Sequence, residues 1–304
     1  MQVTGEQKRL TPALWLLLIL VSFLWGGSFA ANRLVLDEMG FISAVAFRVT
    51  GAAAALWIWI ALRRMPVQLT PRLLFDVVIL GVGGNVITFL FVSWGQQHIA
   101  SSLAGILNAS AAVFTVLLGA LVYTDERLTG SRALGVALSV VGVTVTIGSA
   151  ALRTLDVLAL GQLAVLAGNL TYALCTIHAR RALAGVSPVV STALTFTVGA
   201  PVLVPLALLQ EGAPTLDYRA ETWVAIAFLS LFTSALAYIL FYWLLGLVGA
   251  GNVSLATLLN GPWAILIGAI LLDEILGPSA ITGFCLIALG LIIMDGRLLQ
   301  RLRR

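Results

Sequence analysis

The chain has 304 residues, of which 60% are hydrophobic and only 10% are charged, and its mean hydropathy is +1.06. A soluble domain of this length would expose large apolar surfaces to water, so the composition excludes a water-soluble protein and indicates an integral membrane protein. The net charge of +4 could point to nucleic acid, but its uneven distribution, described below, points to a membrane instead.

Apolar runs long enough to cross the lipid hydrocarbon follow one another along the whole chain. A core of about 30 Å takes roughly 20 helical residues, and almost nothing remains for a soluble domain. We therefore predict an all-α integral membrane protein with ten transmembrane helices, near residues 14–32, 41–62, 73–97, 99–122, 131–149, 157–178, 189–209, 222–245, 252–272 and 279–295.

Basic residues are concentrated at one side of these predicted helices. With ten spans both termini share a side, and that side carries thirteen Lys and Arg residues against three on the other, while Arg48 lies inside the second span. Such an excess is typical of the cytoplasmic side. It predicts a multi-pass protein of a bacterial-type cytoplasmic (inner) membrane, with both termini cytoplasmic, the lipid bilayer as its surrounding and no nucleic-acid partner; the oligomeric state stays open.

The second half of the chain repeats the first. The stretch DERLTGSRALGVALSVVG, residues 125–142, returns as DEILGPSAITGFCLIALG, residues 273–290, with seven of eighteen positions identical. Each half holds five predicted spans, and an odd number makes the second copy enter the membrane from the opposite side. We predict two inverted five-helix repeats, residues 1–150 and 151–304.

The repeated block itself is predicted to be structural. One copy of its acidic pair would face the cytoplasm and the other the outside, so a shared catalytic role is disfavoured. The acids are expected to hold polar turns, and the glycines are expected to form grooves for close helix contact. These glycines are Gly135, Gly142, Gly283 and Gly290.

Several of these features together resemble a known family. The two five-helix halves, Trp25-Gly26, Phe47-Arg48, Pro262 and the doubled terminal block are similar to the EamA family of the drug/metabolite transporter superfamily, over almost the whole chain. Within that family the chain is most similar to YddG-type exporters of aromatic amino acids.

The resemblance implies a secondary transporter that exports small amphipathic metabolites, with aromatic and neutral amino acids first, by alternating access. A carrier of drugs or other metabolites with the same fold is the alternative. The halves differ at two motif positions, where Tyr172-Ala173 replaces Trp25-Gly26 and Thr195 replaces Arg48, which predicts unequal roles for the two halves.

Candidate substrate-binding residues lie near the middle of the predicted spans, where inverted-repeat transporters bind their substrates. An amide in hydrocarbon must face a partner helix or a hydrated cavity, so mid-span asparagines either line the pathway or join helices. These asparagines are Asn85, Asn108, Asn169 and Asn260. We also expect the backbone to be interrupted at Asn260-Gly261-Pro262 and loosened at Gly83-Gly84.

Aromatic side chains accompany these amides at helical spacing. They serve either as core packing or as a sheath for a flat apolar substrate. The aromatic candidates are Phe89, Tyr172, Tyr238 and Trp263, and the hydroxyl of Ser234 lies one turn before Tyr238 on the same predicted helix. Arg48 could attract a substrate carboxylate, or it could reach the outer surface or a backbone carbonyl instead.

Other functions lack the residues that they would need. The sequence contains no GxxxxGK[ST] loop, no deep nucleophile with a base and no cluster of metal ligands, so we expect no ATP drive, no catalytic residue, no cofactor and no metal. An intramembrane enzyme and an ion channel are accordingly disfavoured. We place all thirteen acidic residues in tails, loops or end turns, which predicts facilitated diffusion or exchange without proton coupling.

Overall fold

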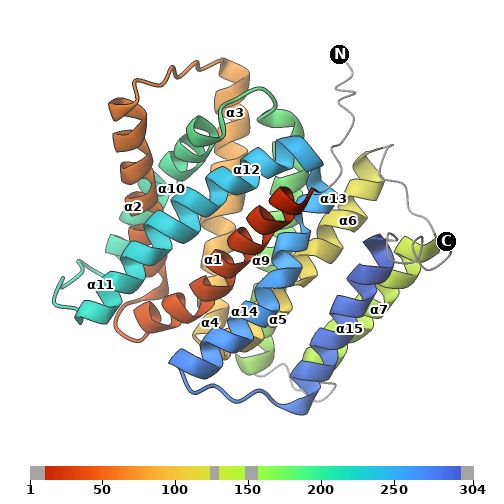
Figure 1. Cartoon of the computed structure of the whole chain (residues 1–304). Helices are drawn as coiled ribbons and strands as arrows, with labels where there is room; N and C mark the ends of the chain where they lie inside the picture. Colours follow the sequence, from red (N-terminus) through yellow and green to blue (C-terminus); the bar gives the residue numbers. More distant parts are fainter. Residues whose placement is uncertain (1–10, 124–129, 148–156, 296–304) are drawn as a thin grey trace.

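The computed structural model describes residues 11–123, 130–147 and 157–295 (Figure 1). Eight of its helical stretches are long and apolar enough to cross a membrane, and shorter apolar helices lie in α7 (Gly130–Ile147) and α15 (Pro278–Asp295). Large apolar side chains such as Phe75, Leu209 and Ile270 are exposed on the outside of the bundle, as a lipid surrounding requires. The predicted all-α membrane class is confirmed.

The long stretches follow the predicted apolar runs closely, and four of them are divided into two or three helical pieces. They are α1 (Pro12–Leu36), α2 (Phe41–Leu62), α3 (Pro71–Leu80) with η1 (Gly81–Ile87) and α4 (Thr88–Gln96), α5 (Ser101–Asn108) with α6 (Ser110–Val122), α9 (Val157–Ala182), α10 (Pro188–Gln210), α11 (Ala220–Ala227) with η2 (Phe228–Leu236) and α12 (Ala237–Val248), and α13 (Ala250–Val253) with α14 (Leu255–Leu271).

Two of these stretches contain a π-helical segment, η1 and η2. η1 covers Gly83 and Gly84, where the sequence predicts a loosened helix. The Gly83 carbonyl accepts a hydrogen bond from the Thr88 hydroxyl at 3.0 Å, so the altered winding leaves this carbonyl satisfied. The looser backbone therefore shapes the helix and does not leave the Gly83 carbonyl open to a ligand.

The predicted interruption at Pro262 is wrong, because α14 continues through this residue from Leu255 to Leu271. The break in this stretch occurs earlier, at Ser254, between α13 and α14. Close packing explains the continuous helix: a Cβ atom at Gly26 of α1 would stand 2.9 Å from the Asn260 carbonyl, so the two backbones hold each other in place.

Most helix pairs lie side by side across the bundle (Figure 1). α2 packs against α10 at one edge, and α7 packs against α15 at the opposite edge. Between them α1 packs on α14, α4 packs on α9, and α5 packs on α14. This central group of helices surrounds the cavity described below.

The contact between α7 and α15 is made by glycines, as the sequence predicts. A Cβ atom at Gly142 would stand 2.7 Å from both the Gly283 carbonyl oxygen and the Ile287 nitrogen, closer than real Cβ atoms approach backbone. At Gly290 a Cβ atom would stand 2.5 Å from the Gly135 carbonyl oxygen. Hydrogen in place of a side chain thus lets the two backbones touch.

Three carboxylates fasten helix starts across the two halves of the chain. Glu211 accepts hydrogen bonds from the backbone nitrogens of Ile42 at 3.0 Å and Ser43 at 2.8 Å, where α2 begins. Glu38 accepts from the Arg219 nitrogen at 3.0 Å and from the Thr222 hydroxyl at 2.6 Å, where α11 begins. Each carboxylate satisfies donors that a helix start leaves without partners.

The third of these carboxylates belongs to the repeated acidic pair. Glu274 accepts from the backbone nitrogens of Ser101 at 2.7 Å and Ser102 at 2.8 Å, and also from the Ser102 hydroxyl. It therefore caps α5 in the other half of the chain. The role is structural, as we predict, but it joins residues that are distant in sequence instead of holding a local turn. The first copy of the pair, residues 125 and 126, lies outside the described residues.

Filling the glycine groove is expected to push α7 and α15 apart. Gly142→Leu should lower the free energy of unfolding by about 1–3 kcal/mol, the usual cost of overpacking. The measurement is thermal unfolding of the purified protein in detergent. Gly130→Leu is the matched control, because a Cβ atom at Gly130 meets nothing within 4 Å. Equal unfolding temperatures for the two variants would show that the close contact of α7 and α15 does not depend on Gly142.

Glu274 should make stability depend on pH. Burial raises the pKa of its carboxyl, but the hydrogen bonds from Ser102 and Ser101 outweigh burial and hold the pKa below its ordinary value. The unfolded chain then takes up the proton first, so the carboxylate stabilises the fold above its ordinary pKa and loses this effect as the pH falls through the lowered value.

We therefore expect the unfolding temperature to drop as the pH falls from about 6 to about 3.5, with a smaller drop in Glu274→Gln. The measurement is thermal unfolding at a series of pH values. An identical drop in the wild type and the variant would show that the capping carboxylate has no part in it.

Candidate functional site

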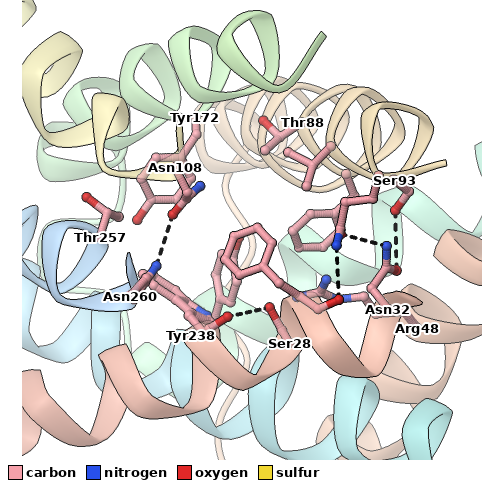
Figure 2. Close-up of a pocket in the computed structure, with 15 residues that line it drawn as sticks. Ser28, Asn32, Arg48, Thr88, Ser93, Asn108, Tyr172, Tyr238, Thr257 and Asn260 are labelled. Atoms are coloured by element: carbon pink, nitrogen blue, oxygen red, sulfur yellow. Dashed lines mark hydrogen bonds between the residues drawn. The ribbon is translucent and has the colours of Figure 1, made fainter. Parts of the chain in front are cut away.

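A cavity lies where helices from the two halves of the chain meet (Figure 2). Its walls come from α1, α2, α4, α5, α9, α12 and α14, so both halves contribute. The described residues that line it are Trp25, Ser28, Phe29, Asn32, Arg48, Thr88, Phe89, Val92, Ser93, Gln96, Asn108, Tyr172, Tyr238, Thr257 and Asn260. Arg48 is the single charged residue among them.

The structure brings together most of the residues singled out from the sequence. Two further candidates, Asn169 and Ser234, are hydrogen-bonded to lining side chains. Asn85 and Trp263 are absent from the lining. The predicted residues that line the cavity themselves are Arg48, Phe89, Asn108, Tyr172, Tyr238 and Asn260.

Three asparagines form a chain of amides at one end of the cavity. Asn108 donates to Asn169 at 2.9 Å, and the Asn108 and Asn260 amides meet at 2.9 Å. Asn260 donates this bond to the Asn108 oxygen, whereas a turned Asn260 amide would place its nitrogen 2.7 Å from the Ala256 carbonyl and its oxygen towards Asn108. Asn169 also donates to Leu107 O at 2.9 Å. The amides therefore join α5, α9 and α14, and those of Asn108 and Asn260 line the cavity as well.

The opposite end of the cavity is a second polar cluster between α1 and α4 (Figure 2). Asn32 donates to the Gln96 side chain at 2.9 Å, and Gln96 donates to the Phe29 carbonyl at 2.9 Å. Ser93 donates to Asn32 at 3.4 Å. Every member of this cluster is buried, so each hydrogen bond replaces one that water would make.

Arg48 reaches the cavity from α2. Its Nε donates to the Ser234 hydroxyl at 2.8 Å, and one terminal nitrogen donates to the Thr233 hydroxyl at 3.2 Å. Its Cζ lies 4.0 Å from the centre of the Phe89 ring, a cation–π arrangement. The side chain therefore does not extend to the outer surface, and its protein partners are hydroxyls and an aromatic ring.

Aromatic rings form the wall between the two polar ends. The Trp25 ring lies 5.4 Å from Tyr238 and 6.0 Å from Tyr172, in edge-to-face contacts. The Trp25 Nε1 donates to the Thr233 carbonyl at 3.0 Å, which fixes the indole. Phe89 lies 6.2 Å from Tyr238 across the cavity lining. Such faces and edges suit a flat apolar group.

Two sequence candidates occupy other places. Trp263 packs edge-on against Phe23 at 5.2 Å, and Phe23 is itself 41% exposed at the outer surface of the bundle. Asn85 is buried in η1, and neither its amide nitrogen nor its amide oxygen has a hydrogen-bond partner among the described residues.

Several lining residues are missed by the sequence argument. Trp25 is noted there only as part of a family motif, although its partner Gly26 is what lets α1 approach α14 and brings the indole to the cavity. Asn32 and Gln96 lie near helix ends, where polar side chains are common and carry no sign of a site. Depth alone, which guided the choice of asparagines, cannot reveal which side of a helix faces the cavity.

One acidic residue is placed differently from our expectation. Asp76 lies in the second turn of α3, is buried, and contacts the His178 ring nitrogen of α9 at 2.8 Å. It is therefore neither in a tail nor in an end turn. The sequence argument for transport without proton coupling therefore loses one of its premises.

A comparison with protein families decides the class of this molecule. The model of the EamA-like transporter family matches the chain twice, over residues 13–148 and 159–294. The chain belongs to the EamA-like transporter family. It is accordingly a multi-pass membrane transporter and not an enzyme.

Curated relatives of this EamA-like transporter span nearly its whole length. A "Probable terminal-alkyne amino-acid exporter" of Streptantibioticus cattleyicolor is 26% identical, over 97% of each chain. A "Probable amino-acid metabolite efflux pump" of Escherichia coli is 25% identical, over 91% of this chain and 93% of its own. A solved structure with 20% identity and a TM-score of 0.69, over 94% of this chain and 97% of that chain, has the same fold.

Proposed function

We propose that this EamA-like transporter exports small amphipathic metabolites, foremost aromatic and neutral amino acids, across a bacterial-type cytoplasmic (inner) membrane by alternating access. The observation that carries the proposal is the cavity between the two family-matched segments, which combines aromatic walls with amides and one cation. An amino acid with a large side chain presents the same combination of a flat apolar part and charged groups. The printed names of two relatives, an exporter and an efflux pump of amino-acid compounds, support this substrate class.

We further propose that ten helices cross the membrane as two inverted repeats, residues 1–150 and 151–304. The pattern of helix contacts supports this arrangement, because the contacts between the two halves occur in matched pairs. α1 packs on α14 as α9 packs on α5 and α6, and α2 packs on η2 as α10 packs on η1. In an inverted-repeat carrier, rocking of such matched units opens a central site to alternate sides.

Individual residues at these paired contacts also correspond. The Ser230 hydroxyl donates to the Phe47 carbonyl at 3.5 Å where η2 meets α2. Gly81 of η1 approaches the Thr195 carbonyl of α10, where a Cβ atom would stand 2.6 Å from it. Ser230 follows Gly81 by 149 residues, close to the 148 of the repeated block, and Thr195, the counterpart of Arg48 in the repeat, is one residue from the counterpart of Phe47.

Labelling of single cysteines tests the proposed orientation. In a background with Cys175 and Cys285 replaced by serine, Arg63→Cys at the end of α2 should react with a membrane-impermeant maleimide only after cells are permeabilised. Ser279→Cys at the start of α15 should react in intact cells. The excess of basic residues on the side of Arg63 is the reason for this expectation. Labelling of both sites in intact cells would rule out the inverted arrangement.

Substrate selectivity tests the aromatic wall. Tyr238→Ala removes one ring of the wall that lines the cavity, and a contact between this ring and a bound phenyl group would be worth about 0.5–1.5 kcal/mol beyond buried area. Transport of phenylalanine relative to threonine into proteoliposomes should therefore fall by roughly twofold to tenfold. Asn260→Ala should lower both rates and leave their ratio nearly unchanged, because it weakens the amide chain that joins the helices.

Trp263→Ala is the comparison variant for this measurement. Trp263 contacts Phe23 outside the cavity, so its removal should leave the phenylalanine-to-threonine ratio unchanged. A fall in the ratio for Trp263→Ala with no fall for Tyr238→Ala would move the binding surface to Trp263, which the sequence also predicts as a substrate-binding residue.

A further inference from the structure

Arg48 is a buried cation without an anionic partner among the residues that the structure describes. Its relative exposure is 8%. None of the ion pairs between residues that the structure describes, such as those of Arg33 and Arg219, includes Arg48. An unpaired charge in the interior of a membrane protein is costly, and such residues are a mark of a ligand pathway.

The hydroxyl partners of Arg48 supply no negative charge. The Thr233 hydroxyl donates its one proton to the Leu229 carbonyl at 2.9 Å, so towards Arg48 it can only accept. Ser234 likewise accepts from Arg48 Nε. A guanidinium has five N–H donors, and these bonds use two, so three remain, which is enough for both oxygens of a carboxylate.

The position of the guanidinium is fixed by its surroundings. Ser234 and Thr233 hold two of its nitrogens, and the Phe89 ring lies against it with 4.0 Å between Cζ and the ring centre. Phe89 and Arg48 both line the cavity, together with Tyr238. A ligand whose anionic end lies at Arg48 would therefore place its apolar part along the aromatic wall.

We propose that Arg48 binds the carboxylate of the transported amino acid and makes a free carboxylate a requirement for recognition. The proposal rests on the proposed export of amino acids and adds the chemical group that the site selects. Molecules of the same shape without the carboxylate are predicted to be poor ligands, because they would leave the guanidinium buried and uncompensated.

The test measures binding of four probes to the purified full chain in lipid nanodiscs by isothermal titration calorimetry. The probes are L-phenylalanine, L-phenylalaninamide, phenethylamine and 3-phenylpropionate, which share the phenyl group and differ in the carboxylate or the ammonium. The wild type should bind phenylalanine at least about tenfold more tightly than phenylalaninamide or phenethylamine, and 3-phenylpropionate should remain a ligand.

Three variants identify the group responsible. Arg48→Gln should weaken phenylalanine binding at least about tenfold and leave phenylalaninamide unchanged, so that the preference for the carboxylate disappears. Arg48→Lys keeps the charge without the planar fork and should retain a reduced preference. Arg63→Gln is the control: it removes the same charge from an exposed arginine that lies over the Trp59 ring, outside the cavity, and should behave as the wild type.

Each outcome decides between the two proposals. Equal binding of phenylalanine and phenylalaninamide by the wild type, or an unchanged preference in Arg48→Gln, would overturn the role of Arg48 and leave amino-acid export standing. Failure of the wild type to bind any of the four probes would overturn the proposed substrate class and the role of Arg48 with it. Should Arg48→Gln not fold, the wild-type series and Arg48→Lys give the decision.

Discussion

Within a bilayer a polar side chain has no water to bond with, and the arrangement of this bundle depends on that constraint. Each amide of the chain Asn169–Asn108–Asn260 finds its partner on another helix. Asn32 and Gln96 satisfy each other in the same way between α1 and α4. Because these bonds face inward, the helices that share them are held around one cavity, and apolar side chains are left for the outside.

Backbone contact is the second means by which the helices are held. Lipid and leucine are equally apolar, so burial alone gives helices in a membrane little reason to associate. Gly142 and Gly283 bring α7 and α15 into direct contact, and Gly26 does the same for α1 and α14. The first contact lies at the edge of the bundle and the second at the cavity. Close contact at glycines therefore holds together both the outer helices and the helices around the cavity.

The sequence predicts helices well here because the bilayer imposes a length on every apolar run. It also predicts the glycine groove, since small residues repeated on one helix face have few other uses. It fails at Pro262, because the cost of a missing hydrogen bond is offset by packing on α1 that no local pattern encodes. It fails to anticipate the carboxylate caps of Glu38 and Glu211 because each reaches a helix that is distant in sequence. Likewise, the sequence indicates that Trp25 lies deep in its span, but it does not indicate which rings surround the indole.

The π-helical winding of η2 has a further consequence, since both hydroxyl partners of Arg48 lie in this segment. Successive residues of an α-helix are turned by about 100°, and a π segment is wound more loosely. Rewinding η2 as a regular α-helix would therefore rotate Ser234 and Thr233 away from the guanidinium, whose place on α2 is unchanged. An anion at Arg48 would bind the donors that these hydroxyls leave free, so the winding of η2 sets the orientation in which the guanidinium presents those donors.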